Sequence, residues 1–158
     1  MADLVSILLK LGSKLGFEVA TEVEASKGAW IDVVWFDSRF KPSSLDLPKP
    51  SKTRRHPVLP IVGFEIEKSI GSKQVKGSVT NLDVLSPIMG IIVLGRSNLD
   101  MARKKTEKYH HKSDEELWKL LVNKVYKWVY AEAQPKTRIV IMTEDEVLRW
   151  AERMGVEI

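Results

Sequence analysis

Three acidic residues lie inside stretches of sequence that are otherwise apolar. Asp32 lies in the run WIDVVWF, and Glu65 and Glu67 lie in the run IVGFEIE. Both runs are rich in the β-branched and aromatic residues that favour β-strands. Because side chains alternate along a strand, we expect Glu65 and Glu67 to project from the same face. Carboxylates crowded together repel one another and are costly to desolvate, so a bound divalent cation would stabilise them.

The rest of the composition limits which cation this could be. The chain has no cysteine, which excludes disulfides, thiolate zinc sites and cysteine nucleophiles. We interpret its three histidines as solvent-exposed, because all fall in polar, basic stretches: His56, His110 and His111. Oxygen ligands without histidine or cysteine favour Mg²⁺ or Mn²⁺ over zinc.

A structural alternative explains two of the acids without a metal. An edge strand can turn one polar face to water, and Glu65 and Glu67 would then be ordinary surface residues. This alternative does not account for Asp32, which stands in a neighbouring apolar strand. We therefore favour the interpretation in which the three acids form one centre.

The order of elements around these acids resembles a known family. The sequence predicts a helix, a strand with an aspartate, a strand with Glu-x-Glu, a helix and a further strand. The matching segments are GAWIDVVWFD (28–37), VGFEIEKS (62–69) and KQVKGSVTNL (73–82). They resemble the PD-(D/E)XK nuclease superfamily, which includes restriction endonucleases and archaeal Holliday junction resolvases. The resemblance spans the chain from its start to the predicted strand that ends at Leu94. It implies a restriction-endonuclease-like α/β fold, a three-layer α/β/α arrangement with a central mixed β-sheet.

The resemblance also implies roles for the three acids. Asp32 looks like the family's metal-binding aspartate, and Glu65 looks like the acid that opens the second half of the motif. Glu67 stands where most members have lysine, although some restriction enzymes are similar to this chain in having glutamate there. The implied role of Glu67 is to orient or deprotonate the attacking water, or to bind a second cation. The implied metal ligands are Asp32, Glu65 and Glu67.

Polar and basic neighbours complete the site that the resemblance implies. Lys68 comes one residue later than the family's usual lysine, and we expect it on the opposite face of the strand. Gln74 or Lys73, at the start of the next helix, resembles the polar residue that many members place beside the site. The catalytic candidates are Asp32, Glu65, Glu67, Lys68 and Gln74. The candidates for nucleic-acid binding are Lys52, Arg54, Arg55, Lys73 and Lys76.

The net charge is +4, and its distribution is more informative than its total. One basic cluster surrounds Arg54 and Arg55, and a second extends from Arg103 to Lys112. Such clusters are the usual footprint of contact with a phosphate backbone. A solvated surface that aids solubility is the alternative interpretation of both clusters.

The function that the resemblance implies is phosphodiester hydrolysis in DNA by a Mg²⁺- or Mn²⁺-dependent endonuclease. DNA would be the partner, and a homodimer is compatible with this function. One alternative is a nuclease-like fold that holds nucleic acid or a protein without cutting, because fold does not fix function. Another is a structural subunit whose five tryptophans serve only core and interface.

The chain of 158 residues is long enough for one domain with a buried core. Apolar periodicity and capping residues predict helices over 2–15, 69–85, 113–130 and 143–154. Strands are predicted over 17–24, 30–36, 61–67, 89–94 and 138–142. Residues 98–112 suit a helix or a loop, and the five prolines of 37–60 predict a long loop. With no apolar run long enough for a membrane helix and no signal-peptide pattern, we expect a cytoplasmic protein.

Overall fold

The computed structural model describes residues 3–37, 39 and 59–158. Five strands form one mixed sheet in the order β1-β2-β3-β4-β5. Strand β2 pairs antiparallel with both β1 and β3, whereas β4 pairs parallel with both β3 and β5. Their bounds are Glu18–Ser26 (β1), Ala29–Phe36 (β2), Pro60–Glu67 (β3), Met89–Leu94 (β4) and Ile139–Thr143 (β5).

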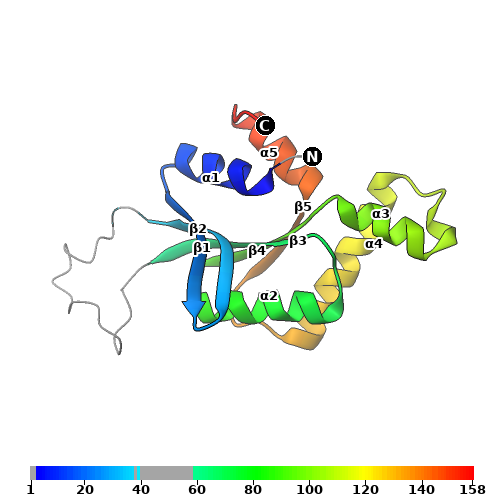
Figure 1. Ribbon diagram of the computed structural model, residues 1–158, viewed down its shortest axis with the longest axis horizontal. Coiled ribbons are helices and arrows are strands. Elements are labelled where there is room, and N and C mark those ends of the chain that lie inside the picture. The colour runs from blue at the N-terminus through cyan, green and yellow to red at the C-terminus, as the bar shows by residue number, and fades with distance from the viewer. Residues whose placement is uncertain (1–2, 38, 40–58) are drawn as a thin grey trace.

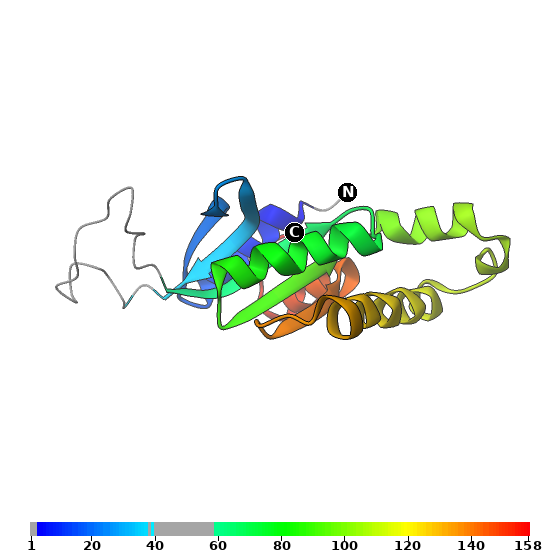
Figure 2. The ribbon, with the colours of Figure 1, turned by 90° about the horizontal axis from the view of Figure 1, so that it is seen from below.

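Helices lie on both faces of this sheet (Figures 1 and 2). Helices α1 (Leu4–Lys14) and α5 (Glu144–Arg153) pack together on one face. Helices α2 (Ser72–Leu85) and α4 (Asp114–Tyr126) cover the other face. Each side has its own cluster of buried hydrophobic side chains. The predicted mixed α/β fold is therefore confirmed, and none of the described helices is long and apolar enough to cross a membrane.

The charged stretch that suited a helix or a loop contains helix α3 (Ser97–Lys105) and a single 3₁₀ turn, η2 (Glu107–Tyr109). The single helix predicted over 113–130 has two parts in the structure. Helix α4 ends at Tyr126, and the chain continues as a π-helix, η3 (Lys127–Ala133). Thr143 is the capping residue that predicted the last helix. Its hydroxyl group accepts from the Glu146 amide and the Glu146 carboxylate accepts from the Thr143 amide, which completes a capping box.

Helix α2 begins later than the sequence predicts and lies close to β3. Gly71 is its N-cap, three residues after Lys68, because the Ile70 amide is already bonded to a side chain of α3. Close approach to the sheet depends on Gly63, where a Cβ atom would lie 2.9 Å from the side chains of Leu82 and Leu85. This approach brings the middle of α2 over the acids of β3.

Trp35 fixes the orientation of β2 in the sheet. Its indole N–H donates to the carbonyl oxygen of Leu8 in α1 at 3.0 Å. Trp35 and Val33 belong to the buried cluster on the α1 side, whereas Val34 packs with the residues of α2. Since side chains alternate along a strand, Asp32 is directed toward α2.

Candidate acidic centre

Glu65 and Glu67 project from the same face of β3, toward α2. The hydroxyl group of Ser78 in α2 contacts both carboxylates, at 3.3 Å from Glu65 Oε2 and closer to Glu67 Oε1. A hydroxyl group has one proton, so it can donate to only one carboxylate at a time. The expectation that the two acids share a face is therefore confirmed.

Asp32 joins them from the neighbouring strand. Its Oδ2 atom accepts a hydrogen bond from the backbone amide of Ile66 at 2.7 Å. The regular backbone pairing of β2 with β3 ends at Val33 and Phe64. Beyond that pair, the Asp32 side chain accepts the hydrogen bond of a β3 amide. Continued by one residue, the register sets Asp32 beside Glu65, so the structure brings together the three acids that the sequence singled out.

Glu65 is the buried member of this group, with 8% of its surface exposed. Its burial and, to a lesser extent, the neighbouring carboxylates of Asp32 and Glu67 together raise its pKa to about 8. Its Oε1 atom is buried and has no hydrogen-bond partner among the described residues. An unpartnered buried carboxylate oxygen is unfavourable unless it is protonated or meets a positive charge.

The other two acids have raised pKa values for the same main reason. Burial raises the pKa of Asp32, the Ile66 amide opposes this, and the charge of Glu22 adds to it. Burial also raises the pKa of Glu67, against the hydrogen bond from Ser78. All three carboxyl groups therefore hold their protons more tightly than free side chains do.

Glu22 of β1 is a fourth acid near this centre, and the sequence reasoning missed it. Its neighbours Thr21 and Val23 pair with Val33 and Ile31 of β2, so Glu22 lies across from Asp32. Its φ angle is +50°, a conformation rare for a residue other than glycine. Counting outward from the hairpin turn at 27–28 would have set Val23 opposite Asp32, because a register shift between Glu24 and Ser26 moves the pairing by one residue.

Ser78 was also missed, although a signal for it exists. It lies among Val75, Val79 and Leu82, the buried residues of α2, and is itself only 4% exposed. A serine within the apolar stripe of a helix needs a buried hydrogen-bond partner. The sequence does not say that the partners are Glu65 and Glu67, because they lie on another element.

Lys68, a predicted catalytic residue, does not lie on the face of β3 that carries the acids. Lys68 is exposed beyond the end of β3 and lines a cavity of about 760 Å³ on the α1 side, together with Leu4 and Leu148. This agrees with its expected position on the opposite face. The charge of Lys68 nevertheless lowers the pKa of Asp32, as the weakest of the contributions there.

The predicted DNA-binding residues fall into three groups. Lys73 is exposed in the first turn of α2, as is the catalytic candidate Gln74 beside it. The ammonium group of Lys76 forms an ion pair with Glu132 at 3.1 Å, so its charge already has a partner. The remaining candidates lie outside the described residues: Lys52, Arg54 and Arg55.

The acidic centre suits a hard divalent cation by the chemistry of its ligands. It offers only carboxylate oxygens, and Glu65 Oε1 has no hydrogen-bond partner in the described part of the chain. In the part of the chain that the structure describes, no three histidine, aspartate or glutamate side chains converge into a metal-binding group. The carboxylates are held instead by hydrogen bonds from Ser78 and from the Ile66 amide.

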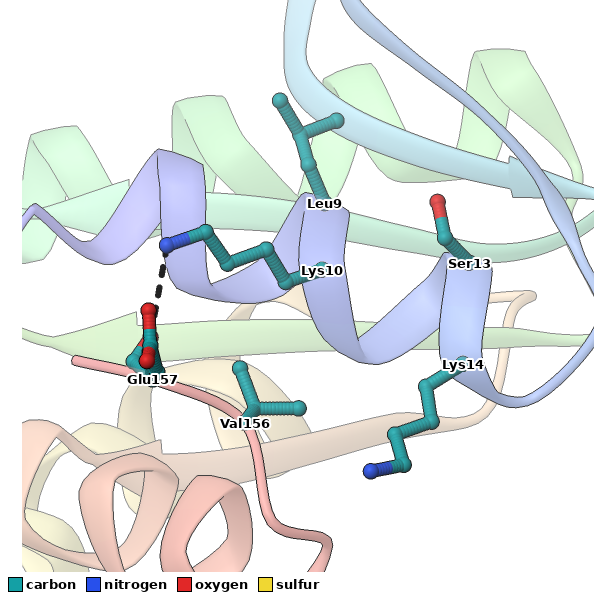
Figure 3. A pocket seen from close by; sticks show the side chains of 6 residues that line it. All are labelled: Leu9, Lys10, Ser13, Lys14, Val156 and Glu157. Carbon is teal, nitrogen blue, oxygen red and sulfur yellow. Dashed lines mark hydrogen bonds between the residues drawn. The ribbon is translucent and has the colours of Figure 1, made fainter.

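A different hollow lies between α1 and the C-terminal segment (Figure 3). Its volume is about 440 Å³, and the ammonium group of Lys10 donates to the backbone carbonyl of Glu157 there. Lys14 also lines it, on the side of the sheet away from α2. This hollow contains none of the three acids and is separate from the candidate centre.

Ser78→Ala tests the contact between α2 and the acids. We expect the free energy of unfolding to fall by about 1–3 kcal/mol, because the buried Glu65 and the half-buried Glu67 lose a shared hydrogen-bond donor. Urea denaturation above pH 8 would measure this change. Thr80→Ala on the same helix is the control, since its hydroxyl group is exposed and bonds only to Lys76 O. Equal effects of the two changes would contradict a special contact at Ser78.

Comparison with known proteins gives no further indication of function. No protein-family model, no curated protein and no solved structure matches the chain.

Proposed function

We propose that this chain is a Mg²⁺- or Mn²⁺-dependent deoxyribonuclease that hydrolyses phosphodiester bonds within DNA. The observation that carries the proposal is the buried Glu65, whose Oε1 atom has no hydrogen-bond partner among the described residues and which lies near the carboxylates of Asp32 and Glu67. Three carboxylates gathered in this way destabilise the fold unless they serve a bound cation.

The fold supports the same proposal. Helix α1, the antiparallel strands β1 to β3, helix α2 and the parallel strand β4 follow one another along the chain. This is the order of elements for which the sequence resembles the PD-(D/E)XK nucleases. We therefore propose that the sheet and its helices form a restriction-endonuclease-like α/β/α arrangement.

In this proposal Asp32 and Glu65 would hold the cation. A cation bound there would polarise a phosphoryl oxygen and lower the pKa of a water molecule. Asp32 would remain anchored through the Ile66 amide, which leaves its second carboxylate oxygen available. Ser78 would keep Glu65 and Glu67 at a fixed separation, and Glu67 would accept the proton of the attacking water.

Glu67→Gln tests this role. The change keeps the shape of the side chain and its contact with Ser78 but removes the basic carboxylate. We expect the nicking rate to fall by about 10²–10⁴-fold, the usual contribution of a general base, with little loss of DNA affinity. Supercoiled plasmid and branched DNA, each with Mg²⁺ or Mn²⁺ and with EDTA as the blank, would measure the rate.

The outcome decides between an enzyme and a binding protein. A wild type that never nicks DNA, together with a Glu67→Gln variant that binds DNA more tightly, would overturn the nuclease proposal. Tighter binding is expected in that case because a carboxylate that only faces phosphate repels it.

A non-catalytic nucleic-acid-binding module is the second candidate. The observation that favours it is the lack of a converged group of three metal-binding side chains within the described parts of the chain. The glutamate at the family's lysine position is compatible with it too. In this case the acids would only oppose the phosphates of the bound DNA, and no cleavage would occur.

A further inference from the structure

Helices α3 and α4, joined by η2, form an arm that extends beyond the sheet (Figures 1 and 2). The base of this arm is fixed to the strand that carries the acids. The side chain of Asn98 in α3 donates to the carbonyl oxygen of Glu67 at 2.9 Å and accepts from the Ile70 amide at 2.7 Å. Asn98 is buried, so the arm begins at a defined place beside Glu67.

A cavity of about 140 Å³ opens between the two helices of the arm. Its volume is several times the roughly 30 Å³ that one water molecule occupies. One wall is Ile70, three residues after Glu67, and two aromatic rings contribute further walls, from Tyr109 and Trp128. Lys105 and Lys124 stand at the same cavity.

The polar side-chain atoms of these two aromatic residues have no hydrogen-bond partner in the described structure, unlike those of their neighbours. The Trp118 indole donates to Asp145, and the hydroxyl groups of Tyr126 and Tyr130 bond to the backbone of β5. Among the described residues, neither the Tyr109 hydroxyl group nor the Trp128 indole N–H has a hydrogen-bond partner. Trp118 and Trp128 lie on consecutive helical segments, yet only Trp128 lines this cavity.

The lysines of the arm are also available for a ligand. In the described structure Lys105 and Lys124 form no ion pair with a carboxylate, and Lys124 lies over the Trp128 ring at 5.4 Å from its centroid. Between residues 97 and 112 five side chains are basic and two, Asp100 and Glu107, are acidic. An aromatic ring that reached Trp128 would displace the ammonium group, which could then face a phosphate.

We propose that the cavity between α3 and α4 holds one unpaired nucleotide of a DNA strand, with its base against Trp128 and Tyr109 and its phosphates against Lys105 and Lys124. This site rests on the proposed function. It specifies which part of the DNA substrate lies next to the acidic centre. Flat rings bind sequence-independently to aromatic side chains, and lysines neutralise the adjoining backbone. The protein would therefore prefer DNA with an unpaired base.

The test measures affinity rather than cleavage, so it does not depend on the proposed nuclease activity. Fluorescence anisotropy with labelled (dT) oligonucleotides, in EDTA, compares the wild type with Trp128→Leu and Tyr109→Leu. We expect each change to weaken binding by roughly 5- to 100-fold, the range for loss of one stacked base. An oligonucleotide with an abasic nucleotide at every position should bind the wild type and Trp128→Leu equally.

Trp128 also packs against the core, so a second variant guards against simple unfolding. Trp128→Phe keeps an aromatic face and should retain most of the affinity, while circular dichroism reports whether Trp128→Leu still folds. Loss of binding to normal and abasic oligonucleotides alike, from a folded variant, would overturn the base-binding part of the inference.

The lysines have a matched control on the same helices. Changing Lys105 and Lys124 together to Gln should flatten the dependence of log affinity on log salt by about 1.4, since each phosphate contact on a single strand contributes about 0.7. Lys119 and Lys127 are exposed on α4 and η3 but do not line the cavity. An equal effect of changing Lys119 and Lys127 to Gln would show general attraction and overturn the site.

Discussion

Asp32→Asn should reduce DNA nicking in the presence of Mn²⁺ by more than about 10²-fold. Losing even an outer partner of a metal ligand costs about 10–100-fold in affinity or activity, and the proposed function makes Asp32 a direct ligand. The fold should survive, because the amide oxygen of asparagine can still accept the hydrogen bond from Ile66. We expect the melting temperature to stay unchanged or rise, since one of three crowded charges is removed.

Asp83→Asn provides the matched control for this result. Asp83 also accepts backbone amide hydrogen bonds, from Lys136 and Thr137, but it lies outside the acidic centre. Its change to asparagine should leave nicking intact. Normal cleavage by Asp32→Asn would show that Asp32 binds no catalytic cation, and the nuclease proposal would fail.

The wild type should become less stable as the pH rises toward alkaline values, and Glu65→Gln should lack most of this loss. In the unfolded chain the pKa of Glu65 returns to 4.5, whereas in the folded chain it is about 8. As the pH rises between these values, the unfolded state releases a proton that the folded state keeps. The unfolded state is therefore favoured progressively, and the free energy of unfolding falls by at most roughly 4–5 kcal/mol across this window.

Urea denaturation of the wild type and Glu65→Gln at several pH values would measure this difference. The two proteins should have similar stability near pH 4 and differ most near pH 9, with some pH dependence remaining from Asp32 and Glu67. Glu144→Gln is the control, because Glu144 is equally buried but accepts a hydrogen bond from the Arg96 amide. Parallel pH profiles for the wild type and Glu65→Gln would contradict a buried, strained carboxyl group.

The same variant also reports on the cation. Under the proposed function Mn²⁺ should restore part of the alkaline stability of the wild type, because a ligand that binds only the folded state stabilises it. It should not do so for Glu65→Gln.

Much of the sheet could be predicted because its signals are local. The apolar run around Asp32 and the alternation around Glu65 and Glu67 depend only on neighbouring residues, and the structure confirms both strands. The capping box at Thr143 is equally local, and it marks the true start of α5. The sequence therefore gives the acids and the elements that bear them.

What could not be predicted depends on residues far apart in the chain. Ser78 contacts the acids only because α2 folds back over β3. Lys76 forms an ion pair with Glu132, which is 56 residues away in the sequence. The π-helix after Tyr126 has no local signal that we recognise. The positive φ angle of Glu22 likewise shows only once the hairpin register is known. Tertiary contacts, rather than propensities, decide these features.

The conformation of Glu22 bears on self-association. Strand β1 is an outer strand of the sheet, and an outer strand with a regular backbone can add a strand from another molecule. The left-handed residue in the middle of β1 interrupts the row of amide and carbonyl groups that such addition needs. Glu18, Glu22 and Glu24 also place exposed negative charge along this edge, so a second copy aligned there would meet like charges. The geometry that sets Glu22 across from Asp32 thus also protects this edge from aggregation.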